Sequence, residues 1–551
     1  MATTAERIPS PEYVEFNAGL SSGLDLMGLR LPVQTISNRL LNGLTTVTPL
    51  LRYLSLRTWL IHRYAHAEPA PPDSWSAFTA YAQQAEAAFA LANLLRSDRV
   101  NGIVGSRRGT QIRDENPDGP FHLKPLTRQP ALDIYGEVSD QLRITQTRID
   151  ARNVLPKIGE EHGEPLVRAT EASLGSTAIA RRLLNVDPVL EEVTLVELEE
   201  FASVVHAQEI PEAERLALLE AVLPSEPQPD DLPRLSTYTA LLALADGPDN
   251  ETEGGLVERD LFMEALAARR STPALLHDVL EGWLLYCVRD CIAVTGELGL
   301  QLILDTIRSM DPDGLGVRDI DLVRYLIEST AGEQLSALRE LGLGEPRDDL
   351  ESLPFRTLVA RVEQATEFQG TPADGIRRWT GGLTELEVAE AAPGFGGGAL
   401  VAGIASWLLS ERRVGLFVRE GRDAFELLSR EGSSRLGIEQ VILPRIEEWV
   451  GRDLSLAEVL EEYTHILIDQ HLRIVWARLA LDPKKDVSVF LRDGDRLLVR
   501  SDYSAGRTAS RVDQAINWLG QLGLLASGFI TAEGRRVLER CFVTLENAAT
   551  S

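Results

Sequence analysis

The chain has 551 residues and a formal net charge of −28, with 83 acidic residues against 55 basic ones. At roughly 150 residues per domain, this length predicts about three or four domains, and the balance of 44% hydrophobic and 25% charged residues excludes wholesale disorder. So acidic a surface repels polyanions over most of its area, which excludes nucleic-acid binding except at a local basic patch.

The cysteine content and the lengths of the apolar stretches indicate in which cellular compartment the protein works. Three cysteines, Cys287, Cys291 and Cys541, cannot build a disulfide framework. The first residues lack the basic and apolar regions of a secretory signal, and the most apolar stretch, residues 396–409, is too short to span a bilayer. We therefore expect a cytoplasmic protein without membrane contact.

Most of the chain has apolar residues spaced three and four apart, which is typical of amphipathic helices. In chain order, this pattern predicts helices from Pro49 to His66, over residues 74–97, 187–208 and 211–223, and over a nearly continuous apolar stretch at 272–310. The last is either one buried helix or two with a break near Gly296. The polar, glycine-containing stretch 98–130 reads as a loop.

The second half continues the helical pattern. Residues 355–368 and 399–413 predict helices on either side of "APGFGGG", which we interpret as a hinge or a close helix contact. A long helix is expected over 454–481, with Asp453 as its N-cap. The pattern as a whole predicts a mainly α, multi-domain helical protein.

Four domains follow from these elements. They are an N-terminal helical domain, residues 1–160, with an Arg-rich loop at 96–128; a central helical domain, 161–375; a helical connector, 376–483; and a C-terminal domain, 484–551.

The C-terminal domain has a different sequence pattern, with short runs of β-forming residues before and between its helices. Two short Val- and Leu-rich runs flank Asp493-Gly494-Asp495 and predict a β-hairpin. An amphipathic helix from Arg507 to Leu522 follows, then a short extended piece at Phe529–Ile530 and a last helix capped by Thr531. This order, with "LGLL" before "FITAEGRRVL", resembles the second half of a bacterial winged helix-turn-helix domain.

The resemblance implies a DNA-recognition helix. Its candidate contacts are Arg507, Thr508, Ser510, Arg511 and Gln514. Residues 484–540 hold ten bases and seven acids, a local balance of +3 that leaves −31 for the remainder. Because neutralisation of phosphates normally carries most of the affinity for DNA, a protein-docking use of the same fold stays open.

The Arg-rich loop is the second candidate for nucleic-acid contact. Gly105-Ser106-Arg107-Arg108-Gly109 can offer backbone N–H groups and two guanidinium groups to a phosphate, and Arg113 follows. The lysine and the Ser or Thr of a P-loop are missing, so nucleotide hydrolysis is not implied. A solvated loop is the competing interpretation.

We find no catalytic or metal-binding constellation in the sequence, and predict no cofactor. His62 and His66 share a helical face, but the spacing supplies no third ligand. His465 and His471 are six residues apart and do not converge. Glu281 and Asp290 are candidate acid–base groups in the apolar stretch, although such groups more often pair with arginines.

The stretch from Gly23 to Leu60 resembles the opening of uncharacterised bacterial proteins encoded among phage- and plasmid-defence genes. The residues that carry the resemblance are Gly23, Leu24, Asp25, Gly28, Leu29, Arg52, Tyr53, Trp59 and Leu60. It implies a cytoplasmic subunit of a multi-protein system and no catalytic residue.

These patterns favour a non-enzymatic subunit of a defence complex, which contacts DNA or acts as a scaffold for a partner ATPase or nuclease. Three alternatives stay open. They are a metal-dependent nuclease that uses Glu281 or Asp290, a kleisin-like linker of an SMC-type ATPase, and a transcription regulator.

Overall fold

The computed structural model describes residues 25–96, 101–147, 153–185, 190–247, 255–267, 273–369, 377–415, 435–481, 486–507 and 509–550. The described chain is mainly helical, as the sequence predicts, and its strands are two to five residues long. None of the described helices combines the length and apolar character that a bilayer crossing requires.

The chain forms two compact units, each built from separated segments. Unit 1 comprises Met1–Ser37, Phe262–Thr272 and Leu280–Thr508, and unit 2 comprises Asn38–Leu261, Pro273–Val279 and Ala509–Ser551. These units do not follow the four contiguous ranges expected from the sequence. Periodicity identifies elements along the chain, whereas the units depend on contacts between distant segments.

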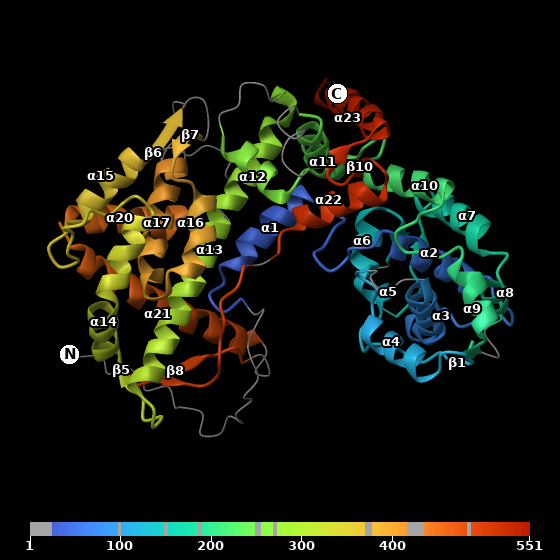
Figure 1. Cartoon of the computed structure of the whole chain (residues 1–551), viewed down its shortest axis with the longest axis horizontal. Helices are drawn as coiled ribbons and strands as arrows, with labels where there is room; N and C mark the ends of the chain where they lie inside the picture. The colour runs from blue at the N-terminus through green and yellow to red at the C-terminus, as the bar shows by residue number, and fades with distance from the viewer. Residues whose placement is uncertain are drawn as a thin grey trace, which may run out of the picture. The chain divides into compact units, whose positions relative to one another are not determined.

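Unit 2 is built around two long helices, α2 (Arg52–Ala65) and α3 (Trp75–Arg96), as Figure 1 shows. Helix α2 packs on α7, and α3 packs on α4 and α9. The other helices are α4 (Ser106–Glu115), α5 (Ala131–Ile134), α6 (Gly136–Gln141), α7 (Gly163–Leu174), α8 (Ala178–Arg182), α9 (Leu195–Ala202), α10 (Glu212–Val222), α11 (Leu232–Ala245), α22 (Arg511–Gln521) and α23 (Ala532–Thr550).

The named strands in the described part of unit 2 pair as antiparallel ladders of two. They are β1 (Phe121–His122) with β4 (Glu192–Val193), β2 (Thr145–Gln146) with β3 (Lys157–Ile158), and β10 (Leu525–Ala526) with β11 (Phe529–Ile530). Such short ladders fasten loops to the helical core rather than forming a layer of their own.

Unit 1 packs helices around α17 (Ala399–Ser410), which contacts α14 (Asp319–Glu340), α15 (Phe355–Ala365), α16 (Glu385–Ala391) and α21 (Leu456–Leu481). Trp407 of α17 stacks on Trp449 of α20 (Leu443–Gly451), with ring centroids 5.7 Å apart, and meets Tyr463 edge-on. Strands β6 (Thr366–Gln369) and β7 (Arg378–Gly382) form a hairpin in this unit.

Three helices extend over the boundaries between the units: α1 (Arg30–Leu40), α12 (Glu258–Leu266) and α13 (His277–Met310). Helix α13 is a single helix of 34 residues with no break at Gly296. A Cβ at this glycine would lie 2.8 Å from Leu29 Cδ1. Gly296 therefore permits close packing inside a continuous helix rather than ending it.

Several local expectations are confirmed. Gly494, at φ 64°, turns β8 (Phe490–Asp493) into β9 (Arg496–Val499), and the glycine-rich stretch is a close helix contact, since a Cβ on Gly398 would lie 2.6 Å from Ala337 Cβ. The hairpin adds to β5 (Val317–Arg318) in the sheet order β5-β9-β8, which belongs to unit 1.

Several boundaries differ from the expectation. Among its described residues, the range 187–208 holds β4 at Glu192–Val193 and a helix only at Leu195–Ala202, and residues 366–368 belong to β6 rather than to the helix that precedes it. The stretch 98–130 contains α4, because Gly109 lets the helix approach α3: a Cβ there would lie 2.6 Å from Leu94 Cδ1. Asp453 does not cap α21, since its φ is 56° and the hydroxyl of Ser455 accepts from the Glu458 N–H instead. Helix α22 begins at Arg511 rather than Arg507, because the Ser510 hydroxyl accepts from the Val512 N–H as its cap.

Candidate functional sites

The C-terminal helices α22 and α23 are joined by a tight hairpin. Ser527 and Gly528 both have positive φ, 52° and 81°, which is the geometry of a two-residue hairpin turn between β10 and β11. Thr531 then caps α23, as predicted, by accepting from the Gly534 N–H at 3.0 Å. The segment is a helix, a hairpin and a second helix, all within unit 2.

The polar side of α22 is bound by residues 41–51 of the same unit. The Arg511 guanidinium donates to the carbonyls of Leu41 and Leu44. One turn and more further on, Asn517 Nδ2 donates to the Pro49 carbonyl at 2.7 Å, and Gln521 Nε2 donates to the same carbonyl at 2.7 Å.

Two further bonds complete this contact. Gln521 Oε1 accepts from the Leu51 N–H at 2.9 Å, and the indole N–H of the fully buried Trp518 donates to the Thr48 carbonyl at 2.9 Å. A groove-reading helix needs its polar side chains directed at bases and phosphates. Here these side chains hold the segment that leads into α2.

The other residues of this segment that are predicted to contact DNA are divided between the two units. Arg507 belongs to unit 1, where its Nε donates to the buried carboxylate of Asp290 at 2.8 Å. Thr508 lies outside the described residues. Ser510 is buried as the cap, and Gln514 has a buried Oε1 with no hydrogen-bond partner in the described part of the chain.

The predicted arginines of the Arg-rich loop, Arg107, Arg108 and Arg113, lie on α4. Arg107 and Arg108 are exposed in its first turn, where the positive end of the helix dipole lies. Arg108 donates to Gln111, and Arg107 makes no ion pair within the described ranges. Arg113 is anchored, since it donates to the Leu94 carbonyl at 2.8 Å and pairs with Asp114.

The candidate acid–base groups do not converge. Asp290 is paired with Arg507, and burial raises the pKa of Asp290 against the lowering effect of that arginine. Glu281 precedes Asp290 by nine residues on α13, which places the two on opposite sides of the helix and about 13 Å apart along it. Among the described residues, no group of three His, Cys, Asp or Glu side chains can hold a metal ion.

The two predicted histidine pairs behave as local contacts. His62 and His66 have ring centroids 4.3 Å apart, and His66 Nδ1 lies 2.8 Å from the His62 carbonyl. His465 is half exposed beside Asp319, whereas His471 is buried between the Leu26 carbonyl and the Val489 N–H.

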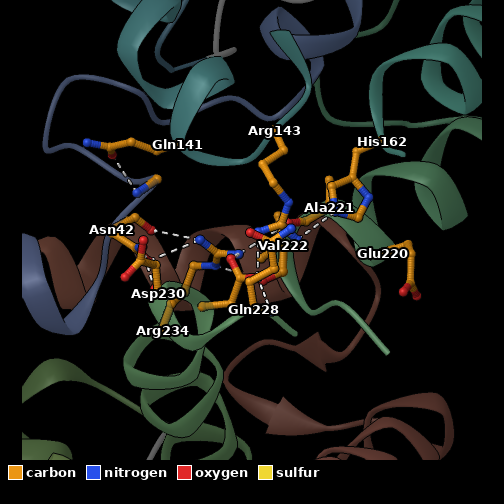
Figure 2. A network of polar contacts seen from close by, with 12 residues as sticks. Asn42, Gln141, Arg143, His162, Glu220, Ala221, Val222, Gln228, Asp230 and Arg234 are labelled. Carbon is orange, nitrogen blue, oxygen red and sulfur yellow. Dashed lines mark hydrogen bonds and ion pairs between the residues drawn. The ribbon is translucent and has the colours of Figure 1, made fainter. Parts of the chain in front are cut away.

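A buried polar network occupies the junction of α6, α7 and α11 in unit 2. Figure 2 shows Arg143, His162 and Arg234 approaching it from three directions. Arg234 Nη2 and Arg143 Nη1 donate to the two carboxylate oxygens of Asp231, at 2.8 Å and 2.6 Å. Arg143 and Arg234 together lower the pKa of Asp231 against the opposing effect of burial.

The network also fixes the ends of the neighbouring helices. Arg234 donates to the Val222 carbonyl at the end of α10 and to Asn42 Oδ1 at 3.0 Å. His162 Nε2 lies 3.3 Å from Arg143 Nη2 and 3.5 Å from Glu161 Oε1. Burial lowers the pKa of His162. With each charge paired inside the core, the network holds unit 2 together rather than presenting a reactive group.

A cavity of about 600 Å³ opens beside this network. Its lining includes Arg57, Trp75, Asp133, Glu137 and Asp140. Arg57, which is 2% exposed, donates through Nε to the Leu132 carbonyl at 3.0 Å and through Nη1 to the Thr145 hydroxyl at 3.0 Å.

The carboxylates of the cavity are connected to the chain by neutral groups. Asp140 accepts from the Thr145 hydroxyl at 2.6 Å, and Glu137 accepts from Gln141 at 3.0 Å. Burial lowers the pKa of Arg57 to about 10, with Asp140 and Asp133 opposing the shift, so the guanidinium is charged at neutral pH. Burial also raises the pKa of Asp133.

Sequence reasoning did not single out any of the cavity residues. Arg57 lies on the apolar helix "RYLSLRTWLIHRYA", where Arg52, Arg57 and Arg63 are all buried. Arginines on a helix that is otherwise apolar on every side must find partners in the core, so this pattern was the available signal. The acids that complete the cavity come from a different segment, whose sequence gave no signal of a site.

Comparison of the chain with protein-family models, with curated proteins and with solved structures finds no match.

Proposed function

We propose that the chain is a non-enzymatic scaffold subunit of a bacterial multi-protein defence assembly, in which it positions a partner ATPase or nuclease. The observation that carries this proposal is the engagement of the polar side of α22. Arg511, Asn517 and Gln521 bind the chain's own segment 41–51, so they are not presented to a DNA groove.

In this proposal the winged-helix-like segment binds a protein partner rather than DNA. Helix α22, the β10–β11 hairpin and α23 supply a compact block, and the resemblance in the sequence supports assigning it to that class. The hairpin around Gly494 belongs to unit 1, so the block that we propose consists of residues 510–550 alone. The defence context comes from the N-terminal resemblance.

A second candidate function is DNA contact through α4. Arg107 and Arg108 are exposed at the positive end of a helix, and such a site attracts phosphate groups. Because the rest of the chain is strongly acidic, this contact alone is expected to be weak and to fall steeply with salt.

The two functions are separated by one set of measurements. The purified chain is tested for DNA binding across a salt series, as wild type, as Arg107→Glu/Arg108→Glu and as Arg511→Glu. The same preparations are tested by light scattering for complexes with the proteins encoded beside it.

The scaffold proposal expects a stable complex with a neighbouring gene product, with or without weak DNA binding that only the α4 variant loses. Tight DNA binding by the isolated chain that the Arg511 variant abolishes, while the fold is retained, would contradict it. Failure to form a complex with any neighbouring product would also contradict it.

A further inference from the structure

The carboxylates around the 600 Å³ cavity of unit 2 form no close ion pairs with the described residues, although Asp140 and Asp133 act electrostatically on Arg57. Asp133, Glu137 and Asp140 make no ion pair with any described residue, although ion pairs are numerous elsewhere on the chain. Together with Arg57 they give the lining a net charge of −2. A cationic ligand is the complement of such a lining.

Arg57 adds a second requirement. Its Nε and Nη1 are satisfied by the Leu132 carbonyl and the Thr145 hydroxyl, whereas Nη2 makes no hydrogen bond within the described residues. This nitrogen lies at the wall of the cavity beside Gly136, where an added Cβ would be 3.6 Å from it. A ligand that fills the cavity must therefore offer an acceptor oxygen as well as a cation.

Trp75 supplies an apolar wall. Its half-buried ring lies under the Arg57 guanidinium, 5.5 Å from the ring centroid, and packs against Phe78 at 5.1 Å. Such a wall suits the methylene stem of a long basic side chain, whose charged end then reaches the carboxylates.

We infer that this cavity binds an arginine or lysine side chain presented by a basic peptide segment. The basic group lies among Asp133, Glu137 and Asp140, the stem lies on Trp75, and a backbone carbonyl of the peptide accepts from Arg57 Nη2. The inference deepens the proposed scaffold function, on which it rests, by naming the chemistry of a partner segment.

The test uses the full chain and a fluorescein-labelled, amidated hexapeptide, Gly-Ala-Arg-Arg-Ala-Gly, in fluorescence anisotropy. Its matched probe replaces both arginines by citrulline, which keeps the shape and removes the charge. We expect the arginine peptide to bind about tenfold more tightly than the citrulline peptide, and the difference to shrink at high salt.

The variant Asp133→Asn/Glu137→Gln removes two exposed carboxylates of the cavity. We expect it to weaken binding of the arginine peptide by about tenfold. The control, Glu191→Gln/Glu199→Gln, removes two exposed carboxylates of the same unit that do not line the cavity, and should change the affinity by less than about twofold.

Equal binding of the two peptides, or equal losses in the two variants, would overturn the inference. So would binding of free argininamide as tight as that of the peptide, because the ligand would then be a small molecule. If neither peptide binds while the chain still forms a complex with a neighbouring gene product, the cavity assignment is wrong and the scaffold proposal stands. If the arginine peptide binds but no complex forms, the scaffold proposal alone is wrong.

Discussion

The contact between α22 and residues 48–51 makes a quantitative prediction about unit 2. Gln521 Oε1 is the hydrogen-bond acceptor of the Leu51 N–H, and Leu51 is fully buried at the start of α2. Gln521→Ala removes that acceptor. The Pro49 carbonyl keeps a donor in the variant, because Asn517 Nδ2 also donates to it at 2.7 Å.

The cost therefore comes mainly from one buried N–H group. An unsatisfied buried donor costs about 1–3 kcal/mol, and the better helix propensity of alanine returns a few tenths of this, roughly 0.4 kcal/mol. We expect Gln521→Ala to lower the free energy of unfolding of unit 2 by about 2 kcal/mol. Asn517→Ala alone should cost well under about 1 kcal/mol, since Gln521 still satisfies the Pro49 carbonyl.

The double variant Asn517→Ala/Gln521→Ala orphans both groups at once. Its cost should exceed the sum of the two single costs by about 1 kcal/mol. Urea unfolding measures the three variants against Asn547→Ala, an exposed amide on α23 that should be silent, and hydrogen exchange reports on the Leu51 amide. Additive costs, or unchanged exchange at Leu51 in Gln521→Ala, would refute the argument.

Three further predictions concern buried charge. Burial raises the pKa of Glu86 from 4.5 to about 8. The folded state therefore holds a proton that the unfolded state loses, and the free energy of unfolding falls as pH rises from 4.5 to about 8. Glu86→Gln should remove this pH dependence and raise Tm at about pH 8. Burial lowers the pKa of His471 from 6.5 to about 4, so its contribution is complete above pH 6.5 and about 3 kcal/mol is lost as pH falls to 4; acid unfolding of unit 1 that is unchanged in His471→Gln would contradict this. Arg413 and Glu385 form a buried pair, so Arg413→Met should cost about 3–5 kcal/mol, and unfolding of Arg413→Met/Glu385→Gln should show most of that loss restored.

The helices were predictable where their apolar spacing is long and their ends are marked. The sequence placed α2, α3 and α21, and the start of α23, to within a few residues, because prolines and hydroxyl residues stand near several of these ends. It missed α4, whose composition is polar, since the contact that stabilises it depends on Gly109 meeting Leu94 of another helix.

The candidate sites were less predictable than the helices, because they depend on contacts between distant segments. Arg507 and Arg511 look like DNA contacts from spacing alone, yet Arg511 binds carbonyls 467 and 470 residues away in sequence. The cavity joins Arg57 and Trp75 to acids of α5 and α6. Nothing in the local pattern of either segment indicates the other.

Three of the residues on which the N-terminal resemblance rests, Arg52, Tyr53 and Trp59, anchor α2 within unit 2. Arg52 forms a buried bidentate pair with Glu214, the Tyr53 hydroxyl accepts from the Val104 N–H, and the Trp59 indole donates to Glu171. A pattern that consists of such anchors specifies how α2 is held in the core, and it is silent about ligands. Proteins with the same anchors should therefore share the packing of α2, and under our proposal the choice of partner depends on exposed groups such as Asp133 and Glu137, which the pattern does not include.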